Sequence, residues 1–202
     1  MIAILDYGSG NLRSAQRAFE TTGLDVVVTS DRKVALEANG LVVPGVGAFQ
    51  SCMNGLIAIG GDEIIRERLS KQRPTLGICI GMQILFSTGL EPSRENTKST
   101  RGVGIWHGSV SRISAPVLPH MGWNTVKPSA GSMLFRGIEE ENFYFVHSYA
   151  VKEAVGLHTS WTEYGERFIS AVEDGVTSAT QFHPEKSGTA GLTLIRNWTQ
   201  TL

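Results

Sequence analysis

A cysteine flanked by glycines is the part of this sequence best suited to chemistry. Cys79 stands at the centre of Gly-Ile-Cys-Ile-Gly, after an apolar run and before a segment with helical periodicity. A nucleophile elbow needs a strand that turns sharply into a helix, with small residues two positions to either side of the nucleophile. Gly77 and Gly81 occupy those positions. The pattern predicts that Cys79 is a nucleophile at the apex of such a turn.

The helix start expected after Cys79 suits a thiolate nucleophile. A helix N-terminus carries partial positive charge, which favours the thiolate form of a nearby cysteine. Its free N–H groups, including that of Ile80, can also stabilise an oxyanion. The alternative is a cysteine that packs as a small apolar side chain, the usual state of a lone cysteine. We accept that alternative for Cys52 and favour the catalytic interpretation for Cys79.

The base that a thiol nucleophile needs is found at His183, in the stretch His-Pro-Glu. Residues two apart in an extended chain point to the same side, so Glu185 can lie beside the imidazole and fix its tautomer. Pro184 stiffens the pair. A surface turn without chemistry is the alternative, and the elbow cysteine elsewhere in the chain weakens it. We therefore expect a triad of Cys79, His183 and Glu185, assembled from different strands of one sheet.

Two glycine-containing loops could also line a site. In Pro-Gly-Val-Gly, residues 44–47, Gly45 and Gly47 can turn a peptide N–H group toward a neighbouring oxyanion, although a plain turn is the alternative. The loop at residues 6–13 has Gly-Ser-Gly after the first apolar run, as in a dinucleotide-binding fingerprint. Arg13 stands at the third glycine position, where its bulk would crowd the helix against the strand, so nucleotide binding is disfavoured.

The elements that must position these residues alternate in the first half of the chain. Apolar or β-branched runs predict strands, and 3.6-residue periodicity predicts helices. The expected strands are 2–7, 24–30, 40–45 and 75–79, and the expected helices are 11–23, a stretch containing 62–71, and 81–89. Continuous apolar strands separated by helices are typical of a parallel sheet covered on both faces. The 44–47 loop and Cys79 would then lie at the carboxyl edge, where ligands bind.

The second half of the chain has a different pattern of apolar and turn residues. After a polar loop at 91–102, short aromatic or β-branched runs are separated by turn residues, which predicts partly antiparallel strands. These runs are 102–114, 142–151, 156–164, 167–175 and 176–185, and a final helix is expected at 188–202. Without a linker or an internal repeat, residues 1–202 are expected to form one domain. The predicted fold class is α/β, a mixed and mostly parallel sheet flanked by helices with an antiparallel section in the second half.

Composition argues against several classes of protein. The 202 residues carry a net charge of −1 without a long run of one sign, so nothing favours nucleic acid or an anionic membrane as partner. No apolar stretch is long enough to cross a bilayer, and the N-terminus lacks a basic leader. Two cysteines do not make a disulfide framework, which favours a reducing, cytoplasmic location. The five histidines lack zinc-site spacing, and we expect neither metal nor cofactor.

These motifs together resemble the class-I, triad-type glutamine amidotransferases. The resemblance covers essentially the whole chain and rests on GICIGMQILF, PGVG and HPE. LPHMGWN, YFVHSY and HPEKSG narrow it to a branch of that family, the glutaminase subunits of imidazole glycerol phosphate synthases in histidine biosynthesis. It implies a flavodoxin-like fold and the hydrolysis of glutamine to glutamate and ammonia, without a cofactor.

The resemblance also implies roles for individual residues. Cys79 is the nucleophile, His183 the base and Glu185 its orienting group. The oxyanion hole involves Gly45, Val46, Gly47 and Ile80, and glutamine is held by Gly47, Gln83, Glu91, Ser148 and Tyr149. The spacing agrees for Gln83, because a residue four positions after Cys79 lies on the same helix face. The role of Glu91, pairing with the α-ammonium of glutamine, rests on the resemblance alone.

A partner follows from the same resemblance. It implies a heterodimer with a separate (βα)₈-barrel synthase subunit, which receives ammonia through a tunnel and whose ligand switches glutamine hydrolysis on. A conformational flip in the 44–47 loop is one way to switch, because glycines tolerate the required dihedral angles. The implied docking residues are Asn11, Trp123, Tyr144 and Lys186, although Trp123 is equally compatible with a place in the core.

Two rival functions stay open at this stage. One is a glutaminase that serves another acceptor, such as a vitamin B6 or aminodeoxychorismate pathway, which the LPHMGWN stretch argues against. The other is a non-catalytic module of similar fold, with Cys79 as a redox or stress sensor. Modification of Cys79 by a glutamine-like electrophile, with protection by glutamine, is expected only of a glutaminase.

Overall fold

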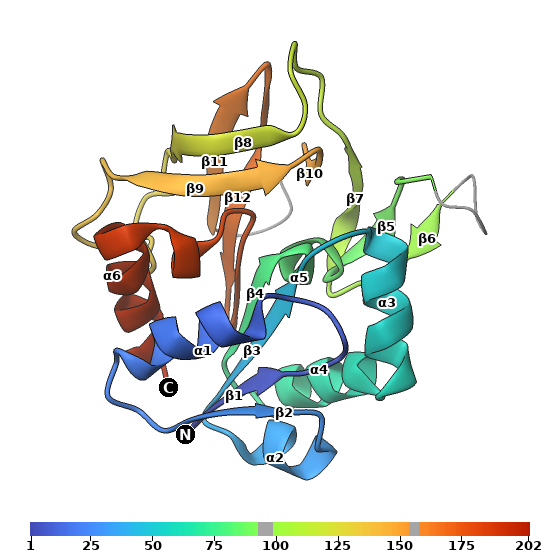
Figure 1. The fold of residues 1–202 in the computed structure, drawn as a ribbon, viewed down its shortest axis with the longest axis vertical. Coiled ribbons are helices and arrows are strands. Elements are labelled where there is room, and N and C mark those ends of the chain that lie inside the picture. Colours follow the sequence, from blue (N-terminus) through green and yellow to red (C-terminus); the bar gives the residue numbers. More distant parts are fainter. Residues whose placement is uncertain (93–98, 154–157) are drawn as a thin grey trace.

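A seven-stranded sheet forms the centre of the protein (Figure 1). The computed structural model describes residues 1–92, 99–153 and 158–202. The strand order is β11-β12-β13-β4-β3-β1-β2, and the five strands from β13 to β2 run parallel. Their bounds are β1 (Ile2–Leu5), β2 (Val26–Thr29), β3 (Gly40–Gly45), β4 (Thr75–Cys79) and β13 (Thr177–Thr180). The expected parallel core is therefore confirmed.

The antiparallel part of this sheet lies at one edge. β12 (Glu166–Asp174) pairs antiparallel with β13, and β11 (His158–Tyr164) pairs antiparallel with β12. Of the strand predicted at 156–164, the first two residues lie outside the described part of the chain, as do residues 93–98 of the predicted polar loop. The expectation of a mixed sheet with its antiparallel section in the second half is confirmed.

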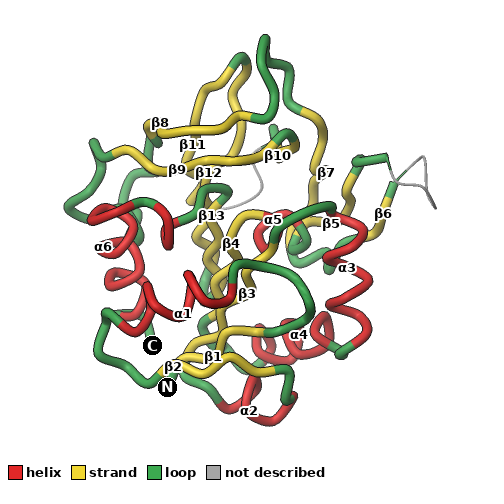
Figure 2. The backbone as a smooth tube through the Cα atoms, in the orientation of Figure 1, coloured by secondary structure: helices red, strands yellow, loops and turns green. Residues whose placement is uncertain are grey.

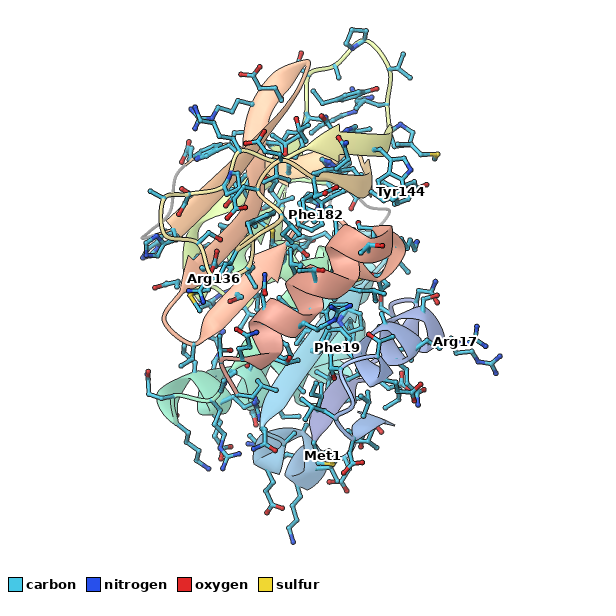
Figure 3. The ribbon with its side chains drawn as sticks, turned by 90° about the vertical axis from the view of Figure 1, so that its left-hand side faces the viewer. Met1, Arg17, Phe19, Arg136, Tyr144 and Phe182 are labelled. Atoms are coloured by element: carbon cyan, nitrogen blue, oxygen red, sulfur yellow. The ribbon has the colours of Figure 1, made fainter. Side chains whose placement is uncertain are left out.

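Helices flank both faces of the sheet (Figure 1). α1 (Leu12–Glu20) and α6 (Gly188–Thr199) lie together, and Phe19 meets Trp198 edge to face at 5.8 Å. In Figure 3, Phe19 lies beneath α6 whereas Arg17 points away from the molecule, as the apolar spacing of α1 requires. The other helices are α2 (Arg32–Glu37), α3 (Phe49–Ala58) and α4 (Gly61–Ser70).

Two smaller sheets lie beyond the carboxyl ends of the parallel strands. β8 (His120–Thr125) and β9 (Asn142–His147) form an antiparallel ribbon above β3 and β4 in the view of Figure 2. The other sheet has the order β10-β7-β5-β6, made of β10 (Tyr149–Val151), β7 (Trp106–Arg112), β5 (Phe86–Gly89) and β6 (Thr100–Arg101). Both sheets bring second-half residues to the edge where Cys79 lies.

The prediction of a helix over residues 81–89 is wrong. α5 comprises only Ile80–Gln83, and the chain then enters β5. Phe86 pairs with Trp106 of β7, and their rings lie 5.3 Å apart, so pairing between strands outweighs the local helical periodicity. Helices α2 and α3 and strand β8 were not predicted. No helix in the described part of the chain is long and apolar enough to span a membrane.

Candidate active site

Cys79 occupies a sharp and strained turn between β4 and α5. Its backbone has φ of +57° and ψ of −112°. Such values are costly for a residue with a side chain, and non-glycine residues with positive φ concentrate at functional sites. Among the described residues, Gln72 is the one other non-glycine residue with positive φ. The predicted elbow is thus present, although the helix that follows it is a single turn.

The glycines of the elbow are required by packing. A Cβ atom on Gly81 would lie 1.8 Å from the carbonyl oxygen of Val43, and one on Gly77 would lie 2.7 Å from the carbonyl oxygen of Gly81. Gly45, which pairs with Cys79 across β3 and β4, has a similar constraint, with 2.6 Å from its Cβ position to the nitrogen of Gly81. The three glycines let β3, β4 and the first turn of α5 approach closely enough to form the apex.

His183 and Glu185 form a buried pair where β13 leads into the short 3₁₀ turn η1 (Pro184–Lys186). Nδ1 of His183 lies 2.7 Å from Oε1 of Glu185, and both side chains are almost completely buried. The backbone is fixed as well, because the His183 N–H donates to the Tyr144 carbonyl and the Ser187 hydroxyl donates to the His183 carbonyl. Nε2 of His183 is buried and makes no hydrogen bond with the described residues. It is therefore free to exchange a proton with a substrate.

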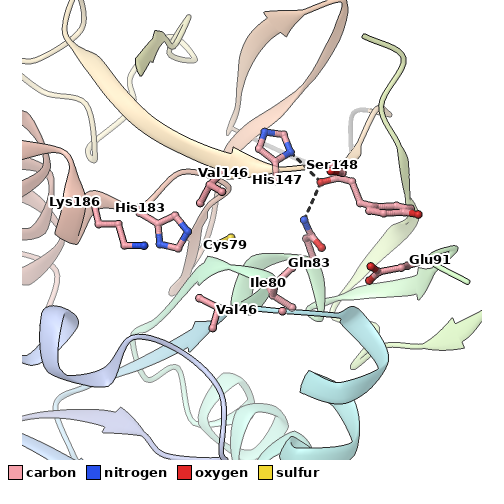
Figure 4. A pocket seen from close by; sticks show the side chains of 12 residues that line it. Val46, Cys79, Ile80, Gln83, Glu91, Val146, His147, Ser148, His183 and Lys186 are labelled. Atoms are coloured by element: carbon pink, nitrogen blue, oxygen red, sulfur yellow. Dashed lines mark hydrogen bonds between the residues drawn. The ribbon is translucent and has the colours of Figure 1, made fainter. Parts of the chain in front are cut away.

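The charge state of His183 is set by its neighbours. Burial lowers the pKa of the imidazole, but the adjacent Cys79 and Glu185 side chains outweigh burial and raise it to about 10. The ring is thus protonated at neutral pH, and an imidazolium beside a cysteine stabilises its thiolate. Figure 4 shows the Cys79 sulfur next to the His183 ring. The two residues, 104 positions apart in the sequence, meet as predicted.

Both residues line one pocket of about 350 Å³. Every substrate-binding position implied by the resemblance lines it too, and of the four implied oxyanion-hole residues only Gly45 does not. The lining residues are Val46, Gly47, Cys79, Ile80, Gln83, Glu91, Val146, His147, Ser148, Tyr149, His183 and Lys186. A volume of this size is within the range of sites for small molecules such as an amino acid.

The 44–47 loop is turned away from the pocket at Val46. The Val46 N–H donates to the Ser9 hydroxyl at 3.1 Å, and the Val46 carbonyl lies 2.9 Å from that hydroxyl and 3.3 Å from the Cys52 sulfur. Gly47 has φ of +94°, a conformation that suits glycine. Gly45 belongs to β3, where its lack of a side chain matters for packing. The peptide of Val46 would have to reorient before its N–H could reach an oxyanion.

Contacts with residues 44–47 also explain the role of the glycine-containing loop at residues 6–13. The Tyr7 hydroxyl donates to the Pro44 carbonyl, and a Cβ atom on Gly10 would lie 3.0 Å from the Pro44 side chain. Together with the Ser9 contacts, these interactions pack the loop on residues 44–47 rather than around an open cradle for phosphates. Cys52 is fully buried beneath the same loop, and burial raises the pKa of its thiol. It is not in the pocket lining, in keeping with the packing role expected for it.

The implied glutamine-binding residues surround the thiol. The Gln83 side chain donates to the Tyr149 carbonyl at 2.8 Å and to Oε1 of Gln181 at 3.0 Å, which fixes its carboxamide. Glu91 lies at the rim, and its Oε2 accepts the Phe49 N–H at 2.9 Å at the start of α3. The Ser148 carbonyl accepts the N–H of Ile113. The carboxylate of Glu91 is therefore held in place by the protein while it faces the pocket.

Of the implied docking residues, Asn11 and Trp123 are exposed, and Tyr144 and Lys186 are partly buried. Trp123 is 58% exposed and contacts Tyr144 across β8 and β9, with ring centroids 6.0 Å apart. The alternative of a core tryptophan is thus wrong. Lys186 lines the pocket, and Asn11 is exposed and accepts the Ser14 N–H at the start of α1. The structure contains no partner chain, so a docking role for these residues stays a prediction.

Sequence reasoning missed two histidines of this region. His147 lines the pocket, and His120 lies directly behind it with its Nδ1 atom 3.0 Å from Nε2 of His147. Apart from His183, the sequence offers the histidines a role only as zinc ligands, and no group of three or more potential ligands clusters in the described part of the chain. Both residues stand inside the stretches LPHMGWN and YFVHSY. Pairing of β8 with β9 brings them together, and β8 was not predicted.

Comparisons with known proteins agree with this geometry. The family model described as "Glutamine amidotransferase class-I" matches residues 3–201. The chain is 56% identical over 205 residues to "Imidazole glycerol phosphate synthase subunit HisH" of Mycolicibacterium paratuberculosis, covering 100% of this chain and 98% of that protein. It is 54% identical over 210 residues, with the same coverage, to the protein of that name from Nocardia farcinica.

A solved structure shares the fold. The "Crystal structure of glutamine amidotransferase" superposes with a TM-score of 0.74 at 17% sequence identity, over 98% of this chain and 97% of that chain. At this identity the structural similarity supports the α/β fold alone, and membership of the family rests on the match over residues 3–201.

Proposed function

Because this chain belongs to the class-I glutamine amidotransferase family, we propose that it hydrolyses glutamine to glutamate and ammonia and delivers the ammonia to a synthase subunit in histidine biosynthesis. The observation that carries the chemistry is the meeting of Cys79, at a strained elbow, with the buried His183–Glu185 pair in one pocket. We take residues 1–202 as one glutamine amidotransferase domain, which the family match over 3–201 supports.

The first half-reaction forms a thioester. The Cys79 thiolate attacks the side-chain carboxamide carbon of glutamine, and the carbonyl oxygen becomes an oxyanion. The N–H groups of Ile80 and of the 44–47 loop stabilise this charge, for which one donor is worth on the order of a hundredfold in rate. The His183 imidazolium donates its Nε2 proton to the leaving nitrogen. The C–N bond then breaks, and ammonia departs.

The second half-reaction returns the enzyme to its starting state. The neutral His183 now accepts a proton from water at Nε2, and the hydroxide attacks the thioester carbon. Collapse of this tetrahedral intermediate expels the Cys79 thiolate and releases glutamate. Glu185 keeps the ring in one orientation throughout, because its carboxylate accepts the Nδ1 proton. The imidazolium and the thiolate are restored together.

Substrate recognition follows from the polar groups at the pocket wall. Gln83 presents a fixed carboxamide near the sulfur, and Glu91 offers a carboxylate at the rim for the α-ammonium of glutamine. The backbone of Gly47, Ser148 and Tyr149 completes the wall. These groups match an α-amino acid with a side-chain amide, and no metal or cofactor is needed for the steps above.

The chain requires a partner, because free ammonia made here has no use within this domain. We propose a heterodimer with a (βα)₈-barrel synthase subunit, cytoplasmic, with Asn11, Trp123, Tyr144 and Lys186 at the interface. Trp123, which is exposed and contacts Tyr144, supports this surface, and Lys186 lines the pocket. Ammonia would pass from the thiol into the barrel without release to solvent. The lyase chemistry that completes the product belongs to the partner.

The test uses the two-subunit complex with Cys79→Ala. Product formation with ammonia should match that of the parent complex, whereas product formation with glutamine should be lost. Glutamine-dependent turnover by the variant would refute the assignment of the nucleophile. Labelling with a glutamine-like electrophile adds a second test: we expect modification of Cys79, protection by glutamine and no modification of Cys52. A redox sensor of the same fold would show no protection, and a glutaminase for another pathway would fail to support this synthase.

A further inference from the structure

A second pair of buried histidines lies behind the pocket, outside the triad. His120 is 2% exposed and His147 is 5% exposed. The two residues face each other across β8 and β9, with Nδ1 of His120 3.0 Å from Nε2 of His147. The His120 ring is stacked between Phe145 at 4.8 Å and Tyr164 at 4.0 Å. The His120 ring cannot change its orientation without disturbing this packing.

The hydrogen-bond partners at one end fix the position of every proton in the pair. Nδ1 of His147 lies 3.0 Å from the Tyr149 carbonyl oxygen, which can only accept, so Nδ1 carries the proton. A neutral His147 must then accept at Nε2, which makes Nδ1 of His120 the donor. A neutral His120 must in turn accept at its own Nε2.

Asn124 supplies the donor that this pattern requires. Its Nδ2 atom lies 3.2 Å from Nε2 of His120 and also donates to the Glu163 carbonyl at 3.1 Å. Its Oδ1 atom accepts the Thr125 N–H at 2.8 Å, which settles the orientation of the amide. A single directional chain of hydrogen bonds therefore runs from Asn124 through His120 and His147 to the Tyr149 carbonyl.

Both rings must stay neutral for the chain to hold, since a protonated ring would place two donors face to face. Burial, together with the neighbouring His120, lowers the pKa of His147 to about 3. Burial also lowers the pKa of His120 to about 4. The chain is therefore complete at physiological pH.

The two ends of this chain of hydrogen bonds lie in different parts of the protein, one in the pocket and the other on β8. The Tyr149 carbonyl also accepts from the Gln83 side chain at 2.8 Å, and Figure 4 shows the two hydrogen bonds meeting there. At the other end, Asn124 and His120 lie on β8, whose alternate side chains Met121 and Trp123 are 62% and 58% exposed. Hydrogen bonds thus connect the inward-facing Asn124 and His120 of β8 to the Gln83 carboxamide in the pocket.

We propose that His120 and His147 are positioning residues, which fix the Tyr149 carbonyl and through it the Gln83 carboxamide that receives glutamine. This inference rests on the proposed function for its substrate. The chain determines which way the Tyr149 peptide points, because an aligned donor on its oxygen resists rotation. Neither ring exchanges protons with glutamine. The same series of hydrogen bonds also connects the pocket wall at Tyr149 to the inner side of β8.

The proton positions can be tested without any activity measurement. Nuclear magnetic resonance of the labelled imidazole nitrogens in the full chain at neutral pH should show the proton on Nδ1 in both rings. His120→Asn and His147→Asn provide the assignments. A proton on Nε2 of either ring, or a charged ring, would overturn the inference. This result stands whether or not the chain proves to be a glutaminase.

The positioning role is tested by two substitutions at one site in the two-subunit complex. His147→Phe keeps the ring volume but removes the donor to Tyr149, and we expect KM for glutamine to rise about tenfold. His147→Asn keeps a donor near the Nδ1 position and should restore KM to within about twofold of the parent. The alkylation rate of Cys79 by iodoacetamide should stay unchanged in both. The control His107→Phe replaces an exposed histidine of β7.

Equal KM values in the phenylalanine and asparagine variants would show that only packing matters and would refute the positioning role. If His147→Phe fails to fold, the asparagine variant and the proton positions still decide, because a large loss of glutamine affinity in His147→Asn contradicts the inference. A parent complex that does not hydrolyse glutamine would instead refute the proposed function.

Discussion

Nδ1 of His183 and Oε1 of Glu185 lie 2.7 Å apart with both side chains almost fully buried, so the orientation of the imidazole is set by a carboxylate two residues along the chain. The contact leaves Nε2 as the atom that faces the Cys79 sulfur (Figure 4). Three further polar contacts fix the backbone around it, through Tyr144 and Ser187. The proposed base and the proposed nucleophile are therefore held independently, each at the end of its own strand.

Replacing Glu185 by glutamine should remove the negative charge beside the His183 imidazole while leaving the size of the side chain nearly unchanged. The neutral amide has nearly the shape of the carboxylate but no longer stabilises the imidazolium or enforces one tautomer. We expect kcat for glutamine hydrolysis in the complex to fall on the order of a hundredfold or more, with ammonia-dependent synthesis unchanged. Glu140→Gln, at an exposed position, is the control. A variant with more than half of the parent kcat would contradict the role given to Glu185.

The raised pKa of His183 should also make stability depend on pH. A histidine whose pKa is raised by folding, here from 6.5 to about 10, contributes stability that is complete below 6.5 and is lost as pH rises through 10. We expect the free energy of unfolding of the parent to fall between these values, and that of His183→Asn to fall less. Urea unfolding at a series of pH values measures both. Parallel curves for parent and variant would show that folding does not raise the pKa of His183.

Close packing at the elbow predicts a large effect from one methyl group. Gly81→Ala would place a Cβ atom 1.8 Å from the Val43 carbonyl oxygen, so β3 or α5 must move. We expect a loss of about 3 kcal/mol or more in the free energy of unfolding, together with loss of glutamine hydrolysis. Gly137→Ala is the matched control, because Gly137 has positive φ but open space, and only about 1 kcal/mol of backbone strain is expected. Similar losses in both variants would exclude a special role for the elbow contact.

Strands β3 and β4 of the parallel core were predictable because their apolar runs are continuous and end in glycine and cysteine. The bounds of β3 and β4 agree with the predicted 40–45 and 75–79 at both ends. The helix predicted over 81–89 failed because Phe86 is taken up by pairing with Trp106, a contact that depends on a strand twenty residues further along. A local pattern does not carry that information.

The site was predictable to the extent that its parts are short motifs. Cys79 and the His183–Glu185 pair follow from glycine spacing and from the two-residue period of an extended chain. His147 could not be assigned in this way, because its partners Tyr149 and His120 are fixed by the pairing of β8 with β9 and by the turn after β9. The direction of the Val46 peptide likewise depends on Ser9, thirty-seven positions away.

That Ser9 contact leads to a prediction about control of the reaction. The Ser9 hydroxyl accepts the Val46 N–H at 3.1 Å, which keeps this N–H from the pocket where an oxyanion would form. Ser9→Ala removes the contact without adding bulk, so the peptide should reorient more easily. We expect glutamine hydrolysis by the chain without its synthase partner to increase about three- to tenfold, because the hydrogen bonds of the Ser9 hydroxyl to the Val46 N–H and carbonyl are lost. Ser70→Ala, which removes an exposed hydroxyl bonded to the Glu67 carbonyl on α4, is the control. An unchanged or lower rate for Ser9→Ala would mean that the Val46 peptide already points as catalysis requires, and stimulation by the partner would then need a different origin.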